Sequence, residues 1–107
     1  MTVTWKCEPL CGDDTFRLSM SIPDYRDVAW VEFVQNTVDD DPYVEVCYLK
    51  SHREGLGYGR AVMEELYSRY PDAHIDWGET IHSASKHLAE DFENKYYSRT
   101  SYIEEVV

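Results

Sequence analysis

The chain has 107 residues, of which 43% are hydrophobic and 14% aromatic, and its formal net charge is −11. This length and composition predict a single domain, residues 1–107, with a packed core, and exclude a disordered chain. The negative charge argues against direct contact with nucleic acid or an anionic membrane, and it favours a cationic amine or a basic protein as partner. Solubility alone is the plainer explanation of the charge.

The N-terminus and the cysteines indicate where the protein works. The sequence "MTVTWKCEPL" lacks the apolar run of a secretory signal, and no segment approaches the roughly 20 apolar residues of a membrane span. Three cysteines, an odd number, favour a reducing compartment, so we expect a cytoplasmic protein. Cys7 and Cys11 are spaced for a metal site or a bridge, but no second pair completes a zinc set and we expect no metal. We expect Cys47 to be a buried packing residue.

The first half of the chain predicts three strands. Residues 15–22, "TFRLSMSI", alternate between apolar and polar, and residues 27–35, "DVAWVEFVQ", are rich in β-branched and aromatic side chains. An acidic turn at residues 37–43 is expected to join the second strand to residues 43–50, "YVEVCYLK". This third segment is apolar on both faces apart from Glu45, which is typical of a central strand.

The second half predicts two helices and two strands. A helix is expected from Arg60 to Tyr70, followed by a short strand at residues 73–79. Ser83 or Ser85 can cap a second helix. Its apolar positions recur every four residues: Ala84, Leu88, Phe92 and Tyr96. Residues 101–107, "SYIEEVV", can form a last strand. The order predicts an α+β (mixed α/β) fold with antiparallel strands first and one β-α-β crossover later.

The stretch "SHREGLGYGRAVMEEL" places Gly55, Gly57 and Gly59 directly before a helix. Unpaired N–H groups of a first helical turn, the helix dipole and the missing Cβ atoms together favour an anion. Basic residues surround the stretch: Lys50, His52, Arg53 and Arg60. We therefore predict a phosphate or pyrophosphate ligand, with a purely structural turn as the alternative. The spacing matches neither a Walker loop nor the G-x-G-x-x-G dinucleotide fingerprint.

The glycine stretch and the elements around it, residues 43 to 97, resemble the GCN5-related N-acetyltransferase (GNAT) family. That family binds acetyl-CoA through a loop of the form [Q/R]-x-x-G-x-[G/A] between a central strand and a helix. The resemblance implies a central, mostly antiparallel sheet with two main helices, and acetyl-CoA as cosubstrate. It also implies the cofactor-binding residues: Arg53, Glu54, Gly55, Leu56, Gly57, Tyr58, Gly59 and Arg60.

The sequence departs from the family pattern at two positions. Glu54 stands where the family has Gln or Arg, although Arg53 is one residue earlier. The family often carries a Tyr in the last helix that protonates the leaving CoA thiolate, and the closest match here is Phe92, which has no proton to give. Tyr96 or Tyr97 can substitute, and we assign the acid role to Tyr96.

Acetyl transfer to an amine needs a base that removes a proton from the ammonium group. Glu45, in the middle of the central strand, is our candidate base, and a solvent-facing Glu without a role is the alternative. Asp76 and Glu79 flank Trp77 and are candidates to bind a cationic acceptor, or else ordinary surface acids. Backbone N–H groups of the central strand are expected to polarise the thioester carbonyl.

Two functions follow from this sequence. The first is a small N-acetyltransferase that moves an acetyl group from acetyl-CoA to a cationic amine, including a protein lysine. The second is a catalytically silent GNAT-like protein whose acidic surface blocks a basic, nucleic-acid-binding surface of a partner. A domain this small can also form a homodimer to complete its core.

Overall fold

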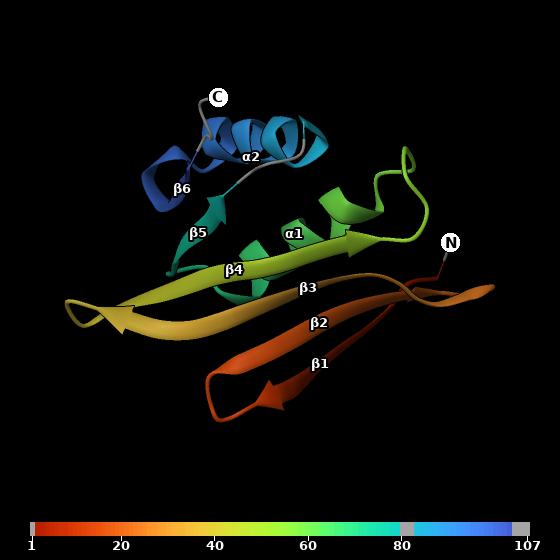
Figure 1. Ribbon diagram of the computed structural model, residues 1–107, viewed down its shortest axis with the longest axis horizontal. Helices are drawn as coiled ribbons and strands as arrows, with labels where there is room; N and C mark the ends of the chain where they lie inside the picture. The colour runs from red at the N-terminus through yellow and green to blue at the C-terminus, as the bar shows by residue number, and fades with distance from the viewer. Residues whose placement is uncertain (1, 80–82, 104–107) are drawn as a thin grey trace.

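The computed structural model describes residues 2–79 and 83–103, which form one six-stranded sheet with two helices (Figure 1). The strands are β1 (Thr4–Cys11), β2 (Thr15–Ile22), β3 (Tyr25–Val38), β4 (Asp41–Ser51), β5 (His74–Glu79) and β6 (Thr100–Ile103). The helices are α1 (Tyr58–Arg69), α2 (Ser83–Lys95) and the 3-10 turn η1 (Tyr97–Arg99). The predicted mixed α/β fold with a mostly antiparallel sheet is confirmed.

The sheet order follows the chain order, β1-β2-β3-β4-β5-β6. The first four strands form an antiparallel meander, whereas β5 pairs in parallel with β4, and β6 with β5. The sequence predicted one β-α-β crossover and the structure has two, because the strand at Thr100–Ile103 continues the parallel part of the sheet. Residues 104–107 of the predicted last strand lie outside the described residues.

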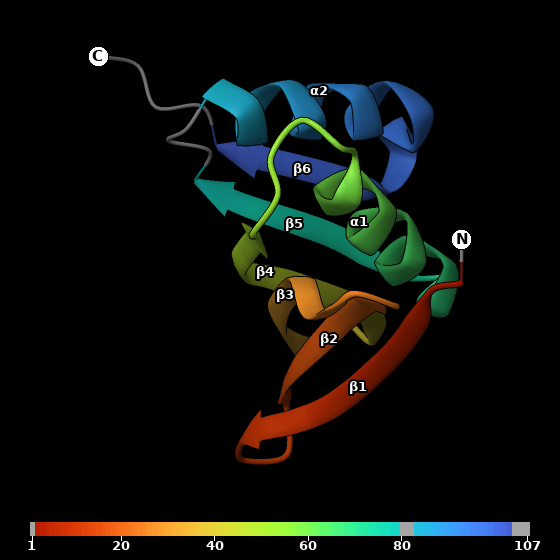
Figure 2. The same cartoon turned by 90° about the vertical axis from the view of Figure 1, so that its right-hand side faces the viewer.

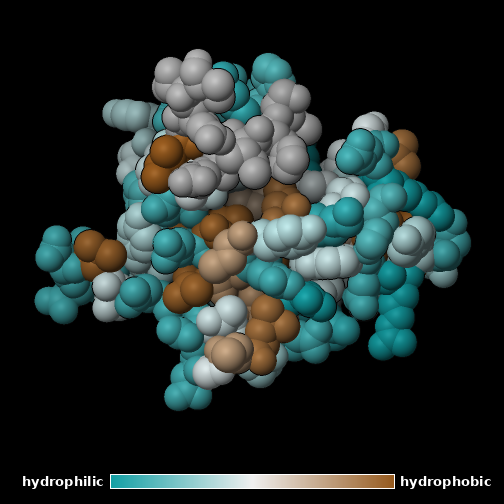
Figure 3. All heavy atoms as spheres, in the orientation of Figure 1, coloured by the Kyte–Doolittle hydropathy of each residue, from teal (hydrophilic) through white to brown (hydrophobic). Residues whose placement is uncertain are grey.

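Both helices lie on one face of the sheet (Figure 2). Parallel crossovers have a constant hand, so two crossovers that step in the same direction place their helices on the same side. Two ion pairs join α1 to α2, Arg60 to Asp91 at 2.7 Å and Glu64 to Lys95 at 3.7 Å. Figure 3 views the opposite, helix-free face, where apolar side chains gather over the middle of the sheet among hydrophilic ones.

Tight turns extend the strands beyond their predicted ends. Asp39 and Asp40 both have positive φ, 51° and 67°, the combination that a two-residue hairpin turn requires. The predicted seven-residue turn is therefore only two residues long, and β3 and β4 run up to it. The sequence prediction missed β1, an edge strand in which six of the eight residues are exposed and which carries Pro9.

The core lies between the sheet and the two helices. The strands contribute residues that are only 0–1% exposed to solvent: Leu18, Val31, Phe33, Val44 and Ile75. The helices contribute their own fully buried side chains: Val62, Met63, Leu66, Ala89 and Phe92. Cys47 was predicted to be buried packing and is instead exposed, because it lies on the other side of β4 from this core. Within the described residues, neither helix is long and apolar enough to cross a bilayer.

Candidate functional site

Strands β4 and β5 pair over three residues and then separate. The register pairs Tyr43 with His74, Val44 with Ile75 and Glu45 with Asp76, and it stops there, although β4 continues to Ser51. We call Asp41–Glu45 the paired half of β4 and Val46–Ser51 its open half. A bulge marks the boundary, since Val46 and Tyr48 pair with consecutive residues of β3 and Cys47 has no counterpart. The open half therefore borders a gap in the sheet.

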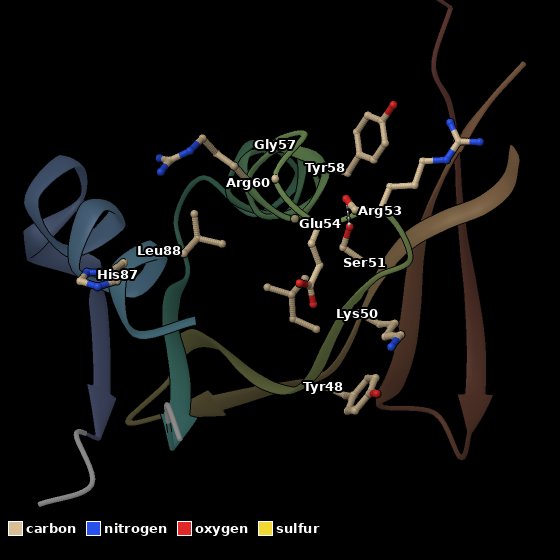
Figure 4. Close-up of a pocket in the computed structure, with 13 residues that line it drawn as sticks. Tyr48, Lys50, Ser51, Arg53, Glu54, Gly57, Tyr58, Arg60, His87 and Leu88 are labelled. Atoms are coloured by element: carbon tan, nitrogen blue, oxygen red, sulfur yellow. Dashed lines mark hydrogen bonds between the residues drawn. The ribbon is translucent and has the colours of Figure 1, made fainter. Parts of the chain in front are cut away.

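A cleft of about 710 Å³ occupies this gap between the open half of β4, the start of α1 and α2 (Figure 4). Seven of the eight residues predicted to bind the cofactor line it, and Leu56 does not: its side chain is 59% exposed. The lining residues from the loop and α1 are Arg53, Glu54, Gly55, Gly57, Tyr58, Gly59 and Arg60. Those from β4 and α2 are Tyr48, Leu49, Lys50, Ser51, His87 and Leu88.

The start of α1 leaves hydrogen-bond donors at the cleft. Gly57 precedes the helix with φ 79°, Gly55 has φ 77°, and no side chain caps the first turn. The first helical hydrogen bond is donated by Ala61 N–H to Gly57 O at 3.0 Å. Within the described residues, the N–H groups of residues 58–60 therefore have no protein acceptor, as the glycine stretch predicted. Such a helix start attracts an anion.

Gly59 differs from the two glycines before it. Its φ lies outside the left-handed region, and a Cβ built on it meets only Leu88 Cδ2, at 4.0 Å. Neither backbone conformation nor packing within the chain therefore calls for glycine, which costs about 1 kcal/mol relative to Ala inside a helix. The space in front of Gly59 is part of the cleft, so a ligand that approaches the backbone there would account for this residue.

The predicted basic island around the loop is largely neutralised. Arg53 donates to Asp24 at 3.3 Å and stacks over Tyr25, and Arg60 donates to Asp91 at 2.7 Å. Figure 4 shows both arginines pointing away from the middle of the cleft, whereas the Glu54 side chain points into it. Lys50 remains without an ion-pair partner among the described residues. The cleft thus offers backbone donors more than side-chain cations.

The proposed base and acceptor residues gather where the pairing of β4 and β5 ends. Glu45 is exposed and lies opposite Asp76 in the register. The Tyr43 hydroxyl donates to Asp76 Oδ2 at 2.8 Å and Gly78 N–H donates to Asp76 Oδ1 at 2.9 Å, so both oxygens are held. Burial, and next the bond to Asp76, raise the pKa of Tyr43 to about 12. The side chain of Glu79 lies outside the described side chains, as do those of Ser83 and Ser85.

Tyr96 and Phe92 belong to an aromatic cluster apart from the cleft. Phe92 is 1% exposed and packs 5.0 Å from Tyr67 and 5.4 Å from Trp77, between ring centroids, and Tyr96 stacks on Tyr67 at 4.5 Å. Tyr96 follows Leu88 by two helical turns, about 12 Å along the axis. The structure therefore does not bring Tyr96 to the cleft, where the tyrosines are Tyr48 and Tyr58.

Sequence reasoning missed five lining residues: Tyr48, Leu49, Ser51, His87 and Leu88. Tyr48 lines the cleft from β4 next to the bulge, and Figure 4 shows its ring pointing away from the loop and α1. His87 and Leu88 come from α2, where the sequence pattern gave Leu88 only as an apolar position of the helix. Their place at the cleft depends on how α2 packs beside α1, which helical periodicity does not specify. The one available signal was the general rule that ligands bind beyond the carboxyl ends of parallel strands.

No protein-family model matches this sequence, and no curated protein sequence matches it. Solved structures do match. A ribosomal-protein-alanine N-acetyltransferase from Brucella melitensis biovar Abortus 2308 is 11% identical with a TM-score of 0.65, over 85% of this chain and 90% of that one. An aminoglycoside acetyltransferase, HMB0005, from an uncultured soil metagenomic sample is 12% identical with a TM-score of 0.60. The match covers 90% of this chain and 64% of that one.

A third solved structure, the tetramutant of the BH1408 protein from Bacillus halodurans, is 18% identical with a TM-score of 0.54 and matches over 78% of this chain. This chain spans 60% of the BH1408 chain and 64% of the aminoglycoside enzyme, so it corresponds to part of each. Identities this low bear on the fold alone. The six-stranded, mostly antiparallel sheet, the two helices and the strand-loop-helix at the gap give this chain a GNAT-like fold.

Proposed function

We propose that this protein is a small N-acetyltransferase that moves an acetyl group from acetyl-CoA to a cationic amine. The observation that carries the proposal is the juxtaposition of an uncapped, glycine-preceded helix start with the open half of β4 on one cleft. The pyrophosphate would accept hydrogen bonds from the first turn of α1. The pantetheine arm, which carries amide groups, would lie along the open half of β4 in place of a neighbouring strand.

The reaction would take place where the gap begins, between the bulge at Cys47 and the end of the paired half. Glu45 would accept a proton from the acceptor ammonium, and the neutral nitrogen would attack the thioester carbonyl carbon. A C–N bond forms, the C–S bond breaks, and CoA leaves as a thiolate that takes up a proton. Backbone N–H groups of the open half, which lack a partner strand on the β5 side, would stabilise the oxyanion.

The acceptor would be an amine that is protonated in solution, such as a lysine of a basic protein. Asp76 and Glu79 lie on β5 next to the gap, and Asp76 carries a carboxylate held in place at both oxygens. The formal charge of −11 favours a cationic partner at longer range. Because Tyr96 lies outside the cleft, the leaving thiolate would take its proton from another donor, and the tyrosines that line the cleft are Tyr48 and Tyr58.

A second function, a catalytically silent acidic binding protein, rests on three observations. The Glu54 carboxylate points into the cleft, and aspartates hold Arg53 and Arg60 in ion pairs. Phe92 is buried at the position where the family often has a Tyr that protonates the leaving thiolate. Each weakens either phosphate binding or protonation of the thiolate. Such a protein would bind a basic partner in a salt-sensitive complex, and it would not bind acetyl-CoA.

The deciding experiment is thermal unfolding of the protein with increasing acetyl-CoA or CoA, with Gly57→Glu as the variant. At 100 times the dissociation constant, a ligand that binds only the folded state adds about 2.7 kcal/mol of stability. We expect this stabilisation in the parent protein and none in Gly57→Glu, whose carboxylate would occupy the anion position. A folded parent protein that shows no stabilisation would reject the acetyltransferase and favour the binding protein.

A further inference from the structure

Four polar side chains from three strands form a connected group on the helix-free face of the sheet. Tyr43 of β4 stacks on His74 of β5, with ring centroids 5.2 Å apart, and donates to Asp76 at 2.8 Å. His74 Nε2 lies 2.9 Å from Ser101 Oγ of β6. The group lies on this face because side chains alternate along a strand and the neighbours Val44, Ile75 and Thr100 are buried on the helix side.

The group ends at the point where the gap between β4 and β5 begins. Asp76 belongs to the last register pair before the strands separate, and its partner in that pair is Glu45. Tyr43 lies two residues before Glu45 in β4 and pairs with His74, yet its hydroxyl reaches Asp76 on β5. Tyr43 therefore connects the rigid, fully paired part of the sheet to a carboxylate at the edge of the reaction position.

The contacts of Asp76 are those of a fixed group rather than of a mobile surface acid. Oδ2 accepts from the Tyr43 hydroxyl and Oδ1 accepts from Gly78 N–H, so the plane of the carboxylate is set by two donors. Gly78 has φ 67°, a left-handed conformation, and a Cβ there would meet Val46 O at 3.6 Å. The Gly78 N–H in the turn of β5 and the Tyr43 hydroxyl thus each hold one oxygen of the carboxylate.

We propose that Tyr43 is a positioning residue, which holds the Asp76 carboxylate in the orientation that receives the ammonium group of the acceptor. This inference rests on the proposed function, because it names the residue that orients the acceptor site. Stacking on His74 fixes the position of the Tyr43 ring, and the Tyr43 hydroxyl orients the Asp76 carboxylate through its hydrogen bond. Ser101 braces His74 from β6.

The test compares Tyr43→Phe with Tyr97→Phe. Phe at position 43 keeps the stacked ring and removes only the hydroxyl. Tyr97, the alternative acid in the sequence, does not line the cleft and therefore makes a matched control, because it is 80% exposed and has no hydrogen-bond partner among the described residues. Asp76→Asn is a second variant, which keeps the shape of the side chain and removes its charge. The thermal unfolding midpoint of each variant shows that it is folded.

Kinetics with acetyl-CoA and spermidine separate positioning from a purely structural role. We expect Tyr43→Phe to bind acetyl-CoA like the parent protein and to raise the KM for spermidine about tenfold, the typical effect of losing one charge-assisted hydrogen bond. Its kcat should change less than threefold, and Tyr97→Phe should match the parent. An unchanged KM in Tyr43→Phe, or a fall in kcat without a rise in KM, would overturn the proposal.

Calorimetric titration of spermidine without acetyl-CoA distinguishes failure of this inference from failure of the proposed function. A parent protein that binds no acetyl-CoA rejects the acetyltransferase, but it leaves this titration as the deciding measurement for Tyr43. Weaker spermidine binding by both Tyr43→Phe and Asp76→Asn than by Tyr97→Phe supports the positioning role. Equal binding by all three variants, or no binding by the parent protein, overturns it.

Discussion

The two halves of β4 belong to one strand and have different surroundings. In the paired half, β3 and β5 flank the strand, and Val44 is buried against Ile75. In the open half, β3 alone flanks the strand, and the other side borders the cleft. The difference shows how one strand provides both stability and a binding surface: β4 keeps its pairing with β3 through a bulge at Cys47, while its pairing with β5 stops after Glu45.

The largest expected effect is on the paired half, from Ile75→Ala. Ile75 is fully buried and pairs with Val44, so the cavity left behind should lower the free energy of unfolding by about 3 kcal/mol. The stabilisation by acetyl-CoA should be unchanged, because the cleft lies beyond the last register pair. Urea unfolding with and without acetyl-CoA measures both quantities.

This substitution and Gly57→Glu should give opposite patterns. Ile75→Ala should lose stability and keep the response to acetyl-CoA, whereas Gly57→Glu should lose the response and keep most of the stability. If Ile75→Ala abolished the response while remaining folded, the two halves of β4 would not be independent.

A smaller effect is expected at the cleft from Asp91→Asn. This change releases Arg60 from its ion pair and removes a negative charge near the predicted pyrophosphate position. We expect acetyl-CoA to bind about two- to fivefold more tightly, the size of one screened charge interaction, and the stability to change by less than about 1 kcal/mol. Calorimetric titration measures the affinity.

Glu64→Gln is the matched control for Asp91→Asn. It breaks the other ion pair between α1 and α2, Glu64 to Lys95, and neither residue lines the cleft. It should leave the affinity unchanged. Equal tightening in both variants would mean that the helix contact, and not the release of Arg60, controls binding.

The smallest effect is the pH dependence of the paired half. The pKa of Tyr43 is raised to about 12, mainly by burial and then by Asp76, so the folded state holds this proton more tightly than the unfolded chain does. Its contribution to stability is therefore complete below about pH 10, the usual pKa, and is lost as the pH rises towards 12. Tyr43→Phe should show a shallower fall in unfolding free energy between pH 9 and 11.5 than Tyr97→Phe, measured by urea titration. Parallel curves would contradict this assignment.

The sequence predicted the fold well where pattern and burial agree. Residues 15–22 alternate because Phe16, Leu18, Met20 and Ile22 all face the core, and the glycine stretch precedes a helix as predicted. β1 was missed because most of its residues are exposed, and an edge strand needs no alternating pattern. A last strand was predicted, but its parallel pairing with β5, which creates the second crossover, is a tertiary contact that local pattern does not specify.

The candidate site was less predictable than the fold, because several of its features depend on tertiary packing. The ion pairs of Arg53 and Arg60 use aspartates 29 and 31 residues away in the chain, and these convert a predicted basic island into a nearly neutral one. Nothing in the local sequence indicates a role for Tyr43, because its contact with Asp76 joins residues 33 positions apart. Local spacing identified the loop but not the side chains that face it.

The strands lie in the sheet in the same order as in the chain, which affects how the protein folds during synthesis. Each strand pairs with the strand made immediately before it, so no strand has to wait for a distant partner. Such local pairing favours rapid folding, and the meander of β1 to β4 can be complete while the rest of the chain is still being made. Because α2 supplies His87 and Leu88 to the cleft, the site is finished last, when nearly the whole domain has left the ribosome.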